Sequence, residues 1–122
     1  MSAASFDSNI LIDALNGQKR AQAELERVDE LWISRVTWIE VMSRVDDATV
    51  GRTRSLLSAF TIDELDEAIA GRAAALRNDR PSLKLPDAVI LASAQVRGRI
   101  LVTRNTKDFP ANMPGIRVPY TL

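Results

Sequence analysis

The sequence predicts an α/β domain in which helices flank both faces of a mainly parallel central sheet. Short strand-like stretches alternate along the chain with stretches whose apolar residues recur at helical spacing, the usual pattern of such three-layer folds. Residues 88–94 are almost all apolar, which indicates a helix buried on most sides. With 122 residues, 46% of them hydrophobic, the chain is expected to form one domain, residues 1–122, with a sizeable core.

Five stretches are expected to form strands. The first is short and covers residues 3–6. The others are residues 31–34, 60–62 and 100–103, and an edge strand marked by Ile116 and Val118 between two prolines.

Six stretches are expected to form helices between these strands. The first begins near Asn9 and ends near Gly17, and the second covers residues 18–27. The others are a helix from Thr37 to about residue 45, one opened by Asp47, one ending near Asn78, and one from Pro86 to about residue 97.

Chemistry-bearing side chains gather where strands end and helices begin. The chain contains no histidine and no cysteine, so hydrolysis cannot use an imidazole base or a thiolate nucleophile. Metal-activated water is then the most available route. Open parallel sheets bind ligands beyond the carboxyl ends of their strands. We therefore expect Asp7, Glu40, Asp87 and Asp108 to converge into an all-oxygen pocket for Mg²⁺ or Mn²⁺.

Each of these acids also has an ordinary explanation. Asp7 is a good helix cap, and Asp87 in the first turn of a helix is favoured by the helix dipole. Thr37 and Glu40 match a capping box, in which the glutamate bonds back to the start of its own helix. Asp108 suits a polar turn.

Acids gathered at one sheet edge need compensation. Two carboxylates about 4 Å apart repel by roughly 4 kcal/mol at an effective dielectric constant near 20. Arginine partners, bound protons or a metal cation must offset this repulsion. Arg35 and Arg104 lie near the acids in sequence, so an inert cluster of ion pairs remains an alternative to a metal site.

Other polar residues near the acids are candidates for supporting roles. Asn9, Thr103 and Asn105 are expected to be auxiliary groups that position a cation or water, and Arg104 is a candidate substrate-binding residue for phosphates.

Charge and targeting signals narrow the class further. Sixteen acids balance sixteen bases, so the chain lacks the broad positive field of a non-specific nucleic-acid coat protein. The N-terminus has no basic region followed by an apolar stretch, and no segment is apolar enough to span a membrane. We expect a cytoplasmic protein without a membrane partner.

The order and spacing of these motifs resemble those of PIN domains, and more narrowly of the VapC-type toxins of bacterial toxin–antitoxin pairs. The resemblance runs from Phe6 to Val118. It is carried by Phe6-Asp7-Ser8-Asn9, by Glu40 early in a helix, by Leu85-Pro86-Asp87-Ala88, and by Leu101-Val102-Thr103-Arg104-Asn105-Thr106-Lys107-Asp108-Phe109.

The resemblance implies a metal-dependent endoribonuclease using Mg²⁺ or Mn²⁺. The family's acidic quartet would fall on Asp7, Glu40, Asp87 and one residue of the turn after the fourth strand. This chain departs from the fully acidic pattern because position 105 is asparagine. Either Asp108 supplies the last carboxylate or Asn105 provides a neutral ligand.

The resemblance also implies partners. They are an RNA substrate, with transfer RNA as one candidate, a cognate VapB-type antitoxin that holds the enzyme inactive, and a second copy of the chain in a homodimer.

Three alternatives remain open from the sequence. A PIN-like fold with a silent pocket would be only a binding module. A phospho-receiver domain would use Asp63 as acceptor but would leave Glu40 and Asp87 idle. A haloacid-dehalogenase-like phosphatase would need a second aspartate that Asp7-Ser8-Asn9 lacks.

Overall fold

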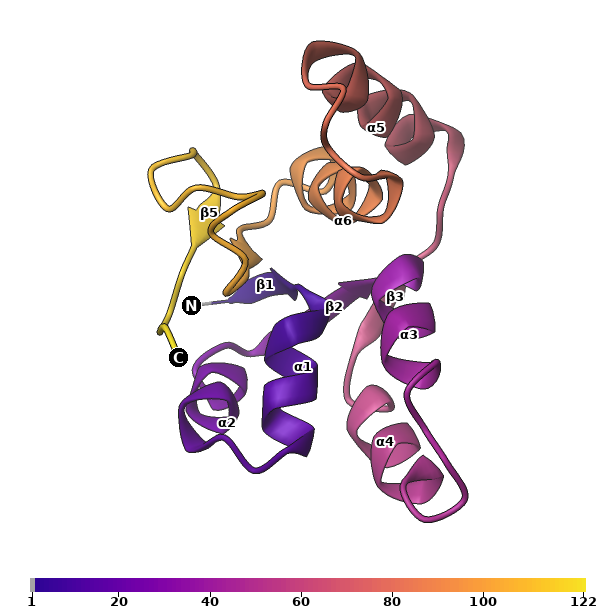
Figure 1. Ribbon diagram of the computed structural model, residues 1–122, viewed down its shortest axis with the longest axis vertical. Helices are drawn as coiled ribbons and strands as arrows, with labels where there is room; N and C mark the ends of the chain where they lie inside the picture. Colours follow the sequence, from indigo (N-terminus) through magenta and orange to yellow (C-terminus); the bar gives the residue numbers. More distant parts are fainter. Residues whose placement is uncertain (1) are drawn as a thin grey trace.

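The centre of the molecule is a five-stranded, all-parallel sheet, as the sequence predicts. The computed structural model describes residues 2–122. The strand order is β3-β2-β1-β4-β5 (Figure 1). The strands are β1 (Ala3–Phe6), β2 (Glu30–Ser34), β3 (Thr61–Asp63), β4 (Leu101–Val102) and β5 (Ile116–Arg117).

Six helices complete the three layers, and the predicted fold class is confirmed. Figure 1 shows α1 to α4 on one side of the sheet and α5 and α6 on the other. The helices are α1 (Ser8–Leu15), α2 (Lys19–Glu26), α3 (Arg35–Met42), α4 (Val50–Leu57), α5 (Glu67–Asp79) and α6 (Leu85–Val96).

Two hydrophobic cores lie on the two faces of the sheet. Phe6 and Ile33 project from β1 and β2 into the core shared with α1 to α4. Leu101 of β4 projects into the second core, which is built mainly from α5 and α6. Residues Ala88–Ala94 are all buried, so α6 is the almost wholly apolar helix that the sequence predicts.

Two predicted helix starts are wrong. Helix α3 begins at Arg35 rather than at Thr37, because the Ser34 hydroxyl caps it by accepting a hydrogen bond from the Val36 amide at 3.1 Å. Helix α4 begins at Val50 rather than at Asp47, because the Asp46 carboxylate ties up a separate turn by accepting from the Thr49 amide at 2.9 Å.

The strand order determines where a ligand can bind. Successive connections run outward from β1 in both directions, first to β2 and β3, then to β4 and β5, so the topological switch point lies between β1 and β4. In open α/β sheets the crevice at that point, beyond the carboxyl ends of the strands, is the usual ligand site. The order also differs from the 2-1-3-4-5 order of phospho-receiver domains.

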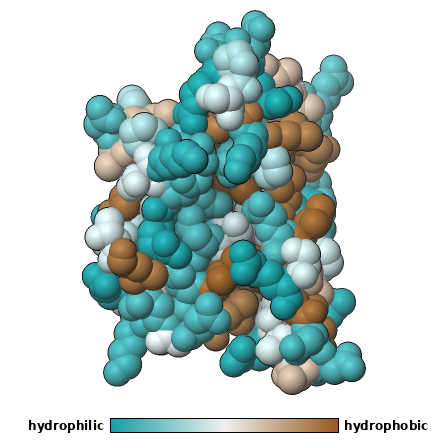
Figure 2. All heavy atoms as spheres, viewed as in Figure 1, coloured by the Kyte–Doolittle hydropathy of each residue, from teal (hydrophilic) through white to brown (hydrophobic). Residues whose placement is uncertain are grey.

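The hydrophobic side chains on the face shown in Figure 2 do not form one continuous surface. They form separate patches on a mainly hydrophilic face. None of the helices formed by residues 2–122 combines the length and apolar character needed to cross a bilayer.

Candidate active site

Asp7 occupies the switch point between β1 and β4. It follows the last residue of β1, caps α1, and is only 3% exposed. Its carboxylate accepts hydrogen bonds from the Ser8 amide at 2.8 Å and from the Thr103 hydroxyl at 2.7 Å. Burial nevertheless raises the pKa of Asp7, and these hydrogen bonds oppose that rise. The site therefore holds a buried carboxylate whose charge is only partly compensated.

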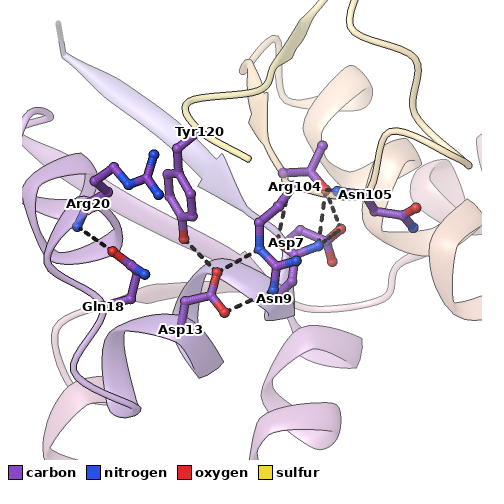
Figure 3. Close-up of polar contacts among 9 residues, drawn as sticks. Asp7, Asn9, Asp13, Gln18, Arg20, Arg104, Asn105 and Tyr120 are labelled. Atoms are coloured by element: carbon purple, nitrogen blue, oxygen red, sulfur yellow. Dashed lines mark hydrogen bonds and ion pairs between the residues drawn. The ribbon is translucent and has the colours of Figure 1, made fainter. Parts of the chain in front are cut away.

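The Asn9 carboxamide links this carboxylate to the segment after β4. Its amide nitrogen lies 3.3 Å from both Asp7 Oδ2 and Thr103 Oγ1. Its carbonyl oxygen accepts from the Arg104 amide at 3.1 Å (Figure 3). Asn9 and Thr103 thus fix the orientation of Asp7.

Glu40 lies in the second turn of α3, half-buried, and its side chain has an unsatisfied oxygen. Because α3 starts at Arg35, Thr37 is inside the helix, and the capping box expected for Thr37 and Glu40 is not formed. Glu40 Oε1 and Thr37 Oγ1 are buried atoms that lack a hydrogen-bond partner among the described residues. Burial, with a further contribution from the charge of Asp7, raises the pKa of Glu40. A buried acceptor without a donor is costly, so this oxygen suits a cation or water.

The charges of the other three acids affect the pKa of Asp87. It stands in the first turn of α6 behind Pro86. Partial burial, followed by the charges of Asp7, Asp108 and Glu40, raises its pKa to about 6. A helix N-terminus alone would favour the ionised form, so burial and the repulsion from neighbouring acids together outweigh the helix dipole.

Asp108 and Asn105 form a closed turn after β4. The Asn105 side-chain amide donates to Asp108 Oδ2 at 2.9 Å, and the Asp108 backbone amide donates to Asn105 Oδ1 at 3.2 Å. The Asn105 hydrogen bond is the main reason why the pKa of Asp108 is lowered. Asn105 therefore positions the Asp108 carboxylate.

The arginines near the site have other partners. Arg35 forms an ion pair with Glu64, and Arg104 forms a bidentate pair with Asp13 at 2.7 and 2.9 Å. Among residues 2–122, no lysine or arginine forms an ion pair with Asp7, Glu40 or Asp87. The inert ion-pair cluster left open by the sequence is therefore not formed by these two arginines.

The donor chemistry fits a hard divalent cation. The carboxylates and the hydroxyl of Thr103 form an all-oxygen set, the kind that Mg²⁺ and Mn²⁺ prefer. Within residues 2–122, however, no group of three or more acids is already arranged to hold one ion. Side-chain rotation would have to bring the oxygens together, which mutual repulsion opposes until a cation is present.

Sequence reasoning missed the network behind Arg104. Tyr120, near the C-terminus, donates to Asp13 Oδ2 at 2.7 Å, so Asp13 joins the two residues (Figure 3). Burial opposes ionisation of Asp13, but the hydrogen bonds from Arg104 and Tyr120 lower its pKa overall. The network anchors the segment after β4 to α1. A substrate role for Arg104 would compete with this ion pair. The one sequence signal for this network is Asp13 itself, a charged residue directly after the apolar run Ile10-Leu11-Ile12.

Comparison with known proteins agrees with this geometry. The family model for the PIN domain matches residues 5–112. A chain of a toxin–antitoxin complex from Klebsiella pneumoniae is 46% identical, with a TM-score of 0.90, over 98% of this chain and 99% of that chain. No curated protein sequence matches significantly.

More distant structures share the fold. A chain of FitAcB from Neisseria gonorrhoeae is 24% identical, with a TM-score of 0.79 and complete coverage of both chains (100% and 100%). A chain of DNA-bound VapBC from Salmonella typhimurium is 20% identical, with a TM-score of 0.81 and 96% coverage of each chain. Since the family model spans most of the chain, the protein is a member of the PIN-domain family.

Proposed function

We propose that this protein is a metal-dependent endoribonuclease toxin that hydrolyses RNA phosphodiester bonds. The observation that carries the proposal is the group of carboxylates near the switch point whose charge is only partly compensated. Asp7, Glu40 and Asp87 come from three separate segments, and burial raises the pKa of each. Such a site is unfavourable for an inert protein and suited to binding cations.

In this proposal Asp7, Glu40, Asp87 and Asp108 hold one or two Mg²⁺ or Mn²⁺ ions. When bound, the metal supplies Lewis-acid stabilisation of charge on the phosphate and activates water for attack. The protein residues supply position. Thr103 and Asn9 orient Asp7, and Asn105 orients Asp108 through its side-chain amide. The buried walls around Asp7 exclude bulk water, which strengthens each electrostatic contact.

We further propose that a cognate VapB-type antitoxin inhibits the enzyme and that the toxin forms homodimers. Support for an antitoxin comes from the similar structures, which are toxin–antitoxin and VapBC complexes. A basic side chain from such a partner would find a pocket of opposite charge. Co-expression with the product of the neighbouring gene, followed by light scattering on the purified complex, tests both parts.

The decisive experiment is cleavage of total RNA by the purified chain in Mg²⁺ or Mn²⁺. An EDTA-treated sample and the Asp87→Asn variant should both lose the discrete fragments made by the unmodified protein. Glu67→Gln is the matched control, because Glu67 is also a first-turn acid but stands on α5, outside the cluster. This control should cleave normally.

Failure has a clear form. If the folded, antitoxin-free chain binds Mn²⁺ yet produces no fragments, the protein is the silent binding module that the sequence left open. Undiminished cleavage by Asp87→Asn would instead remove Asp87 from the site.

A further inference from the structure

A cavity lined mostly by charged and polar residues lies beside Asp108. It has a volume of about 520 Å³ and lies between the end of α5, the start of α6 and the turn after β4. Its walls are Arg80, Ser82, Lys84, Lys107, Asp108 and Pro110. Asp108 lines this cavity and also contributes to the raised pKa of Asp87, so the cavity borders the acidic cluster at this residue.

The cavity is positively charged although the protein is neutral overall. Three of the residues that line the cavity are basic and one is acidic. The basic ones include Lys84 and Lys107, two of the chain's three lysines. Arg80 lies 3.6 Å from Asp108. In the part of the chain that the structure describes, neither lysine forms an ion pair. Both lysines are exposed and free to bind an anion.

Lys84 and Lys107 have no ion-pair partner among the described residues, whereas the arginines near the other acids do. Arg35 and Arg104 are already paired with Glu64 and Asp13. With no net charge, the protein has no general field to attract a polyanion. Affinity for a phosphate backbone must therefore come from local groups that are not already neutralised.

We propose that this cavity binds a phosphodiester group of the RNA strand, adjacent to the phosphate held at the acidic cluster. The inference rests on the proposed function and adds a substrate subsite to it. Lys84 and Lys107 supply the charge, and the Ser82 hydroxyl supplies a neutral donor. A strand that fills this cavity continues past Asp108 into the cluster, where its next phosphate meets the carboxylates. The subsite would thus fix the register of the strand.

The test is binding without cleavage, in an Asp87→Asn background. The probe is a fluorescein-labelled single-stranded RNA, followed by anisotropy over a series of salt concentrations. The Lys84→Ala/Lys107→Ala double variant is compared with Lys19→Ala/Arg54→Ala, which removes two exposed bases from α2 and α4, on the opposite side of the sheet. We expect at least a tenfold loss of affinity only in the cavity variant. The slope of log affinity against log salt should shrink by about 0.7, the value for one phosphate contact to a single strand.

A DNA strand of the same sequence identifies the chemistry. Phosphates are common to both polymers, so the cavity variant should weaken RNA and DNA binding by the same factor. A loss confined to RNA would show that the lysines contact bases or 2′-hydroxyls, and would overturn the phosphate assignment. Equal affinities for the cavity variant and its control would also overturn it.

Cleavage kinetics on the unmodified Asp87 background separate this inference from the proposed function. The cavity variant should raise KM about tenfold and leave kcat within about twofold, because it loses ground-state and transition-state binding equally. A fall in kcat at constant KM would contradict a remote subsite. If the unmodified chain cleaves no RNA, the proposed function fails, and the binding experiment still decides the cavity. Circular dichroism melting of both double variants confirms that each is folded.

Discussion

Asp7 and Asp63 each stand at the carboxyl end of a strand in the same sheet, and both are almost completely buried, with exposures of 3% and 4%. Their surroundings differ. Asp63 forms an ion pair with Arg99, whose side chain is only 11% exposed, and lies 3.6 Å from Arg97. Asp7 has hydrogen bonds from Ser8, Thr103 and Asn9, but no basic partner among residues 2–122.

The difference shows how the same residue type serves structure in one place and is suited to chemistry in another. Arg99 also bonds Ser5 and stacks over the Trp32 ring, so the Asp63 pair joins three strands with the end of α6. Nothing comparable neutralises Asp7. Buried charge that the fold leaves uncompensated marks a site for a ligand, whereas buried charge that the fold pairs marks a structural joint.

The largest expected effect is the loss of RNA cleavage in Asp7→Asn. If Asp7 is a metal ligand as proposed, removing its charge should cost several kcal/mol in the transition state, or roughly 10²–10³-fold in kcat. The amide relieves the burial of a charge, so the free energy of unfolding should stay within about 1 kcal/mol of the unmodified protein. Single-turnover cleavage and urea unfolding measure the two quantities. A variant that loses stability instead would make Asp7 a structural residue like Asp63.

The next effect concerns Asp63→Asn, which should show the opposite result. Removing this carboxylate leaves the Arg99 guanidinium buried without its ionic partner, which should lower the free energy of unfolding by about 3 kcal/mol. Cleavage at a temperature where the variant is folded should be nearly unchanged. A selective loss of kcat in a stable variant would place Asp63 in the chemistry and break the comparison.

The smallest expected effect is a pH-dependent gain in stability in metal-free Asp87→Asn. The pKa of Asp87 is raised from 3.8 to about 6, so the folded state holds a proton that the unfolded state has already released. The stabilisation from that proton is complete below pH about 4 and is lost as the pH rises through about 6. After discounting for solvent screening, the variant should be more stable than the unmodified chain by about 1 kcal/mol at neutral pH and above.

Urea unfolding in EDTA at several pH values measures this difference, which should vanish in acid. At neutral pH, excess Mg²⁺ should make the unmodified chain more stable than Asp87→Asn. A cation that binds the folded state stabilises it, and the unmodified chain should bind Mg²⁺ better than the variant. A difference that stays constant with pH would mean that Asp87 does not feel the other acids.

Sequence patterns over a few residues predicted much of the fold but placed the start of α3 at the wrong residue. The apolar run in α6 and the alternation of strands and helices depend on neighbours in sequence, and both appear as expected. At α3, Ser34 and Thr37 are both good caps. The Thr37–Glu40 spacing favoured the later start, but the chain caps α3 with Ser34. This choice leaves Glu40 Oε1 buried and without a partner, and so available to the site.

The sequence by itself determined the parallel α/β fold and the positions of acids at strand ends and helix starts, because periodicity, caps and turns act over a few residues. Only the tertiary structure decided which acids are neutralised. Asp63 pairs with Arg99, which lies 36 residues away in sequence, and Asp13 pairs with Arg104, which lies 91 residues away. Asp7, Glu40 and Asp87 instead lie close enough for their charges to interact. Charge pairing depends on distance in space, which sequence spacing does not encode.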